Sequence, residues 1–98
     1  MRLTPHEVAA IKAAAREAFG DSAVVRLFGS RVDDALRGGD IDLLMEVDPP
    51  VDEWRAKDVF ADRLFDRIEP RKVDVIVHER GTEARGFQRI GYRDGIVL

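Results

Sequence analysis

The chain has 98 residues, of which 45% are hydrophobic and 36% charged, and its formal net charge at pH 7 is −3. This composition is typical of a soluble globular protein, and the length predicts a single domain over residues 1–98. No basic excess favours extended contact with nucleic acid, and no apolar run is long enough to cross a membrane. The absence of cysteine excludes disulfides and thiolate metal sites. No signal peptide is visible, so we expect a cytoplasmic protein.

The first predicted element is a helix that begins after Thr4, where a proline suits the first helical position. Glu7 completes a capping box with Thr4. Apolar residues at helical spacing follow, and Gly20 predicts the end of the helix. His6 lies in the first helical turn without clustered partners, and we interpret it as a surface residue. The next apolar run predicts a strand over residues 23–28.

This first strand ends abruptly at Gly29 and Ser30. A glycine lets the backbone turn sharply and approach a phosphate closely. If a helical turn begins after Ser30, its free N–H groups point at an anion, and the serine hydroxyl adds another donor. We expect a short helix over residues 31–36 and a loop over residues 37–39. The segment therefore predicts a phosphate-binding turn.

Two carboxylates open the second predicted strand, over residues 40–47. Residues two apart point to the same face of a strand, so Asp40 and Asp42 would project side by side. Adjacent carboxylates repel each other unless a cation lies between them, and their hard oxygen atoms suit Mg²⁺ or Mn²⁺. Asp33 and Asp34 are interpreted as solvated or capping acids. A phosphate-binding turn beside paired carboxylates predicts transfer of a nucleotidyl or phosphoryl group.

The second half of the chain begins with a predicted helix over residues 52–68, followed by a strand over residues 72–78. Trp54 shares the apolar face of the helix, and we interpret it as a core residue rather than a platform for a nucleotide base. We interpret His78 as an ordinary strand-end residue, with lining a cleft as the alternative. Asp74 lies between valines, where a carboxylate is costly to bury unpaired. Either a metal ion or a structural arginine would explain it.

The last segment predicts a helix over residues 83–92, capped by Thr82, and then an extended apolar tail. Arg85, Arg89 and Arg93 repeat every fourth residue. We interpret this basic stripe as a solvated face, or alternatively as a contact for a triphosphate or an acidic partner. The tail would form an edge strand or dock on a partner. The element order predicts an α/β or α+β domain, with a small mixed sheet and helices packed on one side.

Two motifs, Leu27-Phe28-Gly29-Ser30-Arg31 and Gly39-Asp40-Ile41-Asp42-Leu43-Leu44, together resemble the minimal nucleotidyltransferase family of bacteria and archaea. This family belongs to the superfamily that includes DNA polymerase β. The resemblance covers residues 23–77 and implies the minimal nucleotidyltransferase fold. Gly39 stands where these families usually have serine, which removes one hydroxyl contact and leaves the metal ligands intact. The families carry a third acidic residue on the strand after the second helix, and Asp74 matches that position.

The resemblance implies a metal-dependent transfer of a nucleotide from ATP to a hydroxyl group. Asp40 and Asp42 would hold the metal ion that bridges the phosphates. A second metal ion shared with Asp74 would activate the acceptor hydroxyl, and Asp74 would also serve as general base. The Gly-Ser turn would hold the leaving phosphates, and Arg31 would neutralise charge there.

The resemblance also implies a partner, because a minimal domain has no second lobe to bind an acceptor. Minimal nucleotidyltransferases are commonly paired with a small helical HEPN protein, often as the antitoxin of a ribonuclease toxin. In characterised pairs AMP is transferred to a tyrosine of the HEPN protein. Our first hypothesis is therefore an AMP-transferring antitoxin. The alternatives are a nucleotidyltransferase acting on a small molecule such as an aminoglycoside, with a helical partner supplying the acceptor site, and a non-catalytic antitoxin that acts by binding.

Overall fold

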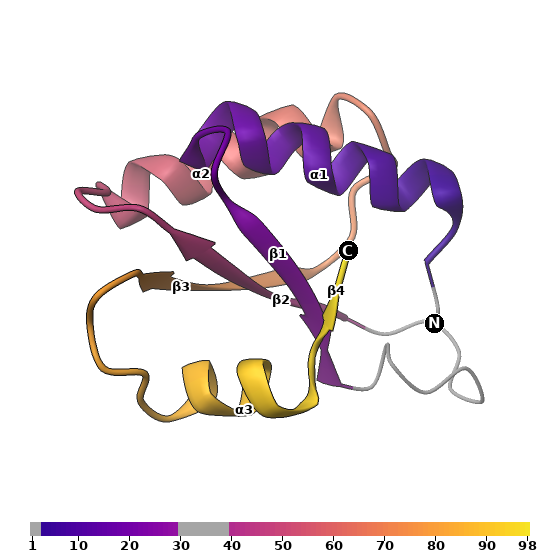
Figure 1. Cartoon of the computed structure of the whole chain (residues 1–98). Helices are drawn as coiled ribbons and strands as arrows, with labels where there is room; N and C mark the ends of the chain where they lie inside the picture. Colours follow the sequence, from indigo (N-terminus) through magenta and orange to yellow (C-terminus); the bar gives the residue numbers. More distant parts are fainter. Residues whose placement is uncertain (1–2, 30–39) are drawn as a thin grey trace.

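The computed structural model describes residues 3–29 and 40–98, which form a four-stranded mixed sheet with helices on both faces (Figure 1). The elements in chain order are α1 (Pro5–Phe19), β1 (Val24–Phe28), β2 (Ile41–Val47), α2 (Glu53–Phe65), β3 (Val73–Glu79), α3 (Phe87–Asp94) and β4 (Ile96–Val97). The strand order is β3-β2-β1-β4. β1 is antiparallel to both β2 and β4, whereas β2 and β3 are parallel. The predicted α+β class with a small mixed sheet is confirmed.

The arrangement of the helices differs from the prediction that all of them pack on one side. Figure 1 shows α1 and α2 on one face of the sheet and α3 on the other. The reason lies in β2, where Leu43 and Leu44 are both completely buried although they point to opposite faces. A Cβ atom at Gly91 of α3 would come within 2.9 Å of the Leu44 side chain. Glycine therefore lets the α3 backbone lie directly on the second face of β2.

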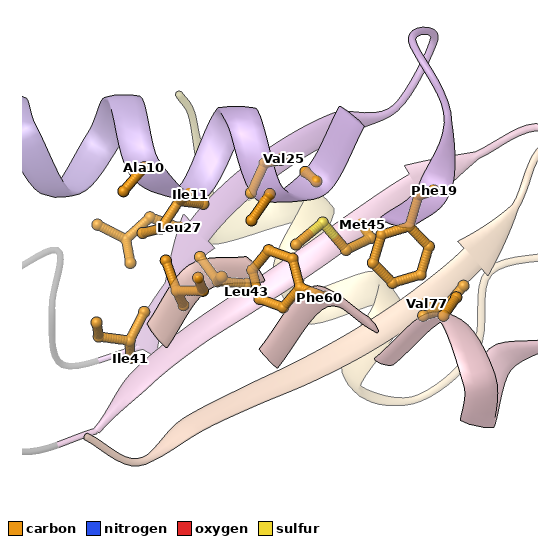
Figure 2. Packing of buried hydrophobic residues seen from close by; sticks show 14 of the residues in the cluster. Ala10, Ile11, Phe19, Val25, Leu27, Ile41, Leu43, Met45, Phe60 and Val77 are labelled. Atoms are coloured by element: carbon orange, nitrogen blue, oxygen red, sulfur yellow. The ribbon is translucent and has the colours of Figure 1, made fainter. Parts of the chain in front are cut away.

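The main core lies between the sheet and the pair α1 and α2 (Figure 2). The rings of Phe19 and Phe60 pack with their centroids 6.1 Å apart. Each fully buried side chain of this size contributes roughly 1.5–3 kcal/mol relative to exposure in water. The prediction of Trp54 as a core residue is wrong, because its side chain is 78% exposed. The buried stripe of α2 runs through Ala56, Phe60 and Leu64, and position 54 points away from it.

The start of α1 follows the predicted capping box. The Glu7 backbone N–H donates to Thr4 Oγ1 at 3.1 Å, and the Thr4 N–H donates to Glu7 Oε1 at 2.9 Å. Gly20 ends the helix with a φ of 102°, a conformation that favours glycine. His6 is exposed as predicted.

The start of α3 differs from the prediction. The helix begins at Phe87, its N-cap is Gly86, and no side chain caps it. The Thr82 hydroxyl instead donates to the Glu79 carbonyl at 2.7 Å, within the turn after β3. A local bond to the backbone has therefore replaced the expected cap. Within the described ranges, no helix is both long and apolar enough to span a membrane.

Candidate active site

Phe28, Asp42 and Asp74 form one row across three neighbouring strands. Phe28 is directly opposite Asp42 in the antiparallel pair, and Asp42 is in register with Asp74 in the parallel pair. Residues in register on adjacent strands point to the same face of a sheet. The two carboxylates therefore project from one face, which they share with Leu44, two residues further along β2. That is the face on which α3 packs.

Asp40 lies just before β2, where the chain enters the sheet. Its Oδ2 is 3.4 Å from Lys72 Nζ, and both side chains are well exposed. The Ile41 N–H donates to the Lys72 carbonyl at 3.1 Å, which fixes the starts of β2 and β3 beside each other. Sequence reasoning missed Lys72, because the position of a lysine before a strand gives no sign of which carboxylate it will meet.

The electrostatics of the row are concentrated on Asp42. Burial raises the pKa of this carboxyl above its usual value, and the negative charges of Asp74 and then Asp40 raise it further. The charge of Lys72 acts in the opposite direction, and a side-chain hydrogen bond with Asp74 again raises the pKa. Negative charge at this site therefore exceeds the positive charge available to balance it, so a cation bound here would be stabilised.

Gly29 closes the site from the end of β1. Its φ is 76°, a conformation that L side chains rarely adopt. A Cβ atom at this position would also collide with the Asp42 carboxylate. Glycine is thus required twice, once for the turn and once for the close approach of backbone to carboxylate.

The structure brings together four of the six predicted site residues: Gly29, Asp40, Asp42 and Asp74. Ser30 and Arg31 lie outside the described residues, as do the short helix predicted over 31–36 and the loop over 37–39.

The chemistry of the donor set fits a hard divalent cation. The described residues contain no group of three or more carboxylate or imidazole side chains arranged to hold a metal ion. Mg²⁺, however, usually takes one or two carboxylates together with water and substrate phosphates. Burial and then the charges of Asp74 and Asp40 raise the pKa of Asp42, and a divalent cation beside these oxygen atoms would relieve the charge repulsion.

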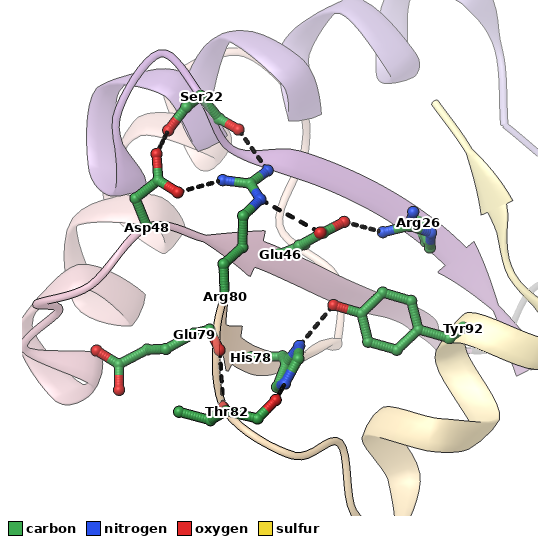
Figure 3. Close-up of polar contacts among 9 residues, drawn as sticks. All are labelled: Ser22, Arg26, Glu46, Asp48, His78, Glu79, Arg80, Thr82 and Tyr92. Carbon is green, nitrogen blue, oxygen red and sulfur yellow. Dashed lines mark hydrogen bonds and ion pairs between the residues drawn. The ribbon is translucent and has the colours of Figure 1, made fainter.

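A polar network lies on the same face, away from the carboxylate row (Figure 3). Arg80 donates to Asp48 Oδ1 at 2.9 Å, to the Ser22 carbonyl at 2.7 Å and, through Nε, to Glu46 at 3.2 Å. Arg26 donates to the other oxygen of Glu46 at 2.6 Å. The hydrogen bond from Arg26 is the main reason that the pKa of Glu46 is lowered. The carboxylates at this end of the face are therefore balanced by arginines, in contrast to Asp42.

His78 lies next to the last residue of β3, as predicted, and it belongs to this network. The side chain is buried, with Nε2 2.9 Å from the Thr82 carbonyl and Nδ1 2.6 Å from the Tyr92 hydroxyl. Because a carbonyl only accepts, Nε2 carries the proton, and in the neutral ring Nδ1 accepts from Tyr92. The imidazole thus ties α3 to β3, and it does not line the carboxylate site.

The small mixed sheet and the three helices of the described residues are compatible with the minimal nucleotidyltransferase fold. The family model of the nucleotidyltransferase domain matches residues 8–93, and the chain therefore belongs to this family. Comparison with curated proteins gives no significant match. The predicted superfamily is confirmed, and the protein is a transferase with a nucleotidyl transfer activity.

Proposed function

We propose that the protein transfers AMP from ATP, with Mg²⁺ or Mn²⁺, to a tyrosine hydroxyl of a HEPN toxin partner and thereby inactivates it. One observation carries the catalytic half of this proposal: Asp42 is in register with Asp74, feels the charge of Asp40, and lies against the backbone of Gly29. The antitoxin half rests on the resemblance of the two sequence motifs to minimal nucleotidyltransferases.

The three aspartates would hold the divalent cation, which supplies neutralisation of phosphate charge when bound. Gly29 bends the chain so that the turn after β1 begins beside Asp42. The acceptor oxygen attacks the α-phosphorus of ATP, the bond from that phosphorus to the β-phosphate oxygen breaks, and pyrophosphate leaves. Asp74 is the exposed member of the row. It accepts the proton of the attacking hydroxyl as general base.

The test uses the co-purified complex with its helical partner and ATP labelled either at the α- or at the γ-phosphate. Label from the α-phosphate should appear on a tyrosine of the partner, and label from the γ-phosphate should not. Well-folded Asp74→Asn protein should give no transfer. If labelling is absent with every divalent cation, the transfer proposal fails. If an inactive variant still neutralises the toxin fully, binding alone is the mechanism.

Ser30 gives a separate test of the phosphate turn. Removing its hydroxyl in Ser30→Ala should weaken ATP binding by about 1–3 kcal/mol, the range for a hydrogen bond to a charged group. Calorimetric titration of wild type and variant measures the difference. Equal affinities would reduce Ser30 to a turn residue.

The partner interface that we propose includes the exposed side of α3. Arg85 pairs with Glu83 at 3.4 Å and Arg93 with Asp94 at 2.9 Å. We propose that Arg89, which is exposed on α3, steers an acidic patch of the partner. Arg89→Glu should slow association most at low salt, because exposed charges are screened as salt rises. Association rates are compared for the variant and the wild type in 20 mM and 200 mM salt, where the screening lengths are about 20 Å and about 7 Å. Equal rates for the two proteins at both salt concentrations would show that Arg89 does not contact the partner.

A further inference from the structure

The ion pair between Lys72 and Asp40 continues the register of the carboxylate row. In the chain that enters β2, Asp40 precedes Asp42 by two residues. In the chain that enters β3, Lys72 precedes Asp74 by the same interval. Because Asp42 is in register with Asp74 on parallel strands, the same alignment carried back along both chains places the lysine beside Asp40. The distance of 3.4 Å between Lys72 Nζ and Asp40 Oδ2 agrees with this placement.

The other cations near the start of β3 have partners outside the candidate site. Three cations line the groove between α2 and β3: Lys57, Arg71 and Lys72. Arg71 lies 2.7 Å from Glu7 of α1, and Lys57 lies 4.0 Å from Glu53, one turn before it in α2. Of the three, only Lys72 pairs with a carboxylate of the candidate site in the part of the chain that the structure describes. Lys72 is therefore the cation of this groove that a ligand of the site would meet.

The pair of Lys72 with Asp40 is easily opened. The lysine side chain is 68% exposed and the aspartate side chain 46%. Ion pairs between exposed side chains contribute little to stability, because water and salt compete for both charges. A divalent cation on Asp40 would repel the ammonium, since two positive charges would then share one carboxylate. The lysine side chain would leave Asp40, while its backbone stays held by the hydrogen bond from the Ile41 N–H.

The displaced ammonium suits the second component that the site would bind. An ammonium presents three N–H donors on a flexible four-carbon side chain, and it binds phosphate oxygen atoms as a point charge. Phosphate groups on a cation held by Asp40 would place negative charge beside the ammonium that this cation displaces. The charge of Lys72 also lowers the pKa of Asp42, which supports its electrostatic contact with the carboxylate row.

We propose that Lys72 exchanges partners: it pairs with Asp40 while no divalent cation is bound, and it binds the phosphate groups of the nucleotide once the cation occupies Asp40. The identity of these ligands rests on the proposed function. The exchange has two consequences of opposite sign. Lys72 competes with a divalent cation that arrives without nucleotide, and it strengthens the binding of a triphosphate that arrives with the cation. A lysine that only stabilises the starts of β2 and β3 would produce neither effect.

The test compares wild type with Lys72→Gln, which removes the charge from an exposed side chain. Binding of Mn²⁺ alone is measured from the electron paramagnetic resonance of the free ion, and binding of a non-hydrolysable ATP analogue in saturating Mn²⁺ is measured by calorimetry. We expect Lys72→Gln to bind Mn²⁺ about two- to fivefold more tightly, because the cation no longer displaces an exposed ion pair. We expect it to bind the analogue about tenfold more weakly or worse, as for a lost hydrogen bond to a charged group.

Two further variants and a second ligand identify the contact. Lys57→Gln removes the charge of the other lysine of the groove, whose partner Glu53 lies outside the site, and should change neither affinity. Lys72→Arg keeps the positive charge and should recover most of the affinity for the analogue. Inorganic tripolyphosphate with Mn²⁺ should lose as much affinity in Lys72→Gln as the analogue does, because the contact is with phosphate.

Each departure from this pattern overturns the exchange. Equal affinities of wild type and Lys72→Gln for the analogue would leave Lys72 as a surface ion pair. Unchanged binding of Mn²⁺ alone would show that the lysine does not compete for Asp40, and weaker binding would show that it supports the site structurally. A loss of affinity that is absent with tripolyphosphate would place the contact on the nucleoside. Equal effects of Lys57→Gln and Lys72→Gln would reduce both to a general change of surface charge.

Labelled ATP and the helical partner separate this inference from the proposed function. Transfer of AMP to the partner by Lys72→Gln with an unchanged KM for ATP overturns the exchange and leaves the proposed function in place. The expected pattern of affinities without labelling of the partner, under any divalent cation, refutes the proposed acceptor and supports the exchange.

Discussion

Replacing Asp42 with asparagine should stabilise the fold while removing activity. Asp42 and Asp74 are in register on adjacent strands, which lie about 5 Å apart. Two unit charges at that separation repel by about 3 kcal/mol at an effective dielectric constant near 20. Measured cross-strand pairs give smaller values, up to about 1 kcal/mol. We therefore expect Asp42→Asn to gain about 1–3 kcal/mol at pH 7 without metal ions. For a domain of this size, each kcal/mol raises Tm by about 4–8 °C.

The stability gained by Asp42→Asn should depend on pH, in a direction set by the pKa shift of Asp42. The pKa of Asp42 is raised in the folded protein, so ionisation of this carboxyl costs stability. The protonated carboxyl contributes to the free energy of unfolding. This contribution is fully present below the pKa of the unfolded chain, about 3.9, and is lost as pH rises through the pKa of the folded protein. The advantage of Asp42→Asn should therefore be largest at neutral pH and should disappear below about pH 3.9.

The assay is thermal unfolding followed by circular dichroism in EDTA, at pH 7 and at pH 3, with Asp62→Asn on the exposed side of α2 as control. Adding Mg²⁺ with a non-hydrolysable ATP analogue should stabilise wild type more than Asp42→Asn, since only ligands of the folded state raise stability. An equal or lower Tm for Asp42→Asn at pH 7 would refute the electrostatic coupling. Undiminished nucleotide transfer by the folded variant would refute the metal assignment.

Three further predictions concern single contacts. Gly29→Ala should destabilise the protein more than Gly81→Ala in urea unfolding. Both glycines have positive φ, but a new Cβ would meet a carboxylate at Gly29 and nothing within 4 Å at Gly81. Equal losses of stability would mean that only the φ strain, about 1–2 kcal/mol, acts at both positions. Trp54→Ala should change stability by less than about 0.5 kcal/mol, because the side chain is 78% exposed, and a larger loss by chemical denaturation would return Trp54 to the core. Tyr92→Phe should cost about 1–3 kcal/mol, because it leaves Nδ1 of buried His78 without its donor, and an unchanged urea midpoint would show that water replaces the hydroxyl.

Much of the fold was predictable because its signals are local. Thr4 and Glu7 specify the start of α1 within one turn of chain, and strand alternation located β1, β2 and β3 to within one residue at each end. Trp54 was misplaced because the helical pattern admits more than one apolar stripe, and only packing selects the one through Phe60. The position of α3 was not predictable either. It depends on Gly91 meeting Leu44 across the sheet, and neither residue signals that contact in the sequence.

For the candidate site too, features set by local spacing were predictable, and features set by strand alignment were not. The spacing of Asp40 and Asp42 on one strand is a local property, so their common face could be predicted. The register of Asp42 with Asp74 depends on how β2 and β3 align, and only the family resemblance anticipated it. Lys72 was missed because its partner is decided by where two strands begin. The collision between a Cβ at Gly29 and Asp42 is a three-dimensional reason for a glycine that the sequence could justify only as a turn.

The two halves of the α3 face differ in how their carboxylates are balanced by positive charge. In one half, Glu46 lies between Arg26 and Arg80, and its pKa is lowered. In the other half, Asp42 faces two carboxylates and one lysine, and its pKa is raised. Internal ion pairs satisfy the first half, so an added cation would gain little there. In the second half, burial and the charges of Asp74 and Asp40 disfavour ionised Asp42, and a bound cation would offset that cost. The carboxylate row is therefore the part of this face that the protein's own residues leave incomplete.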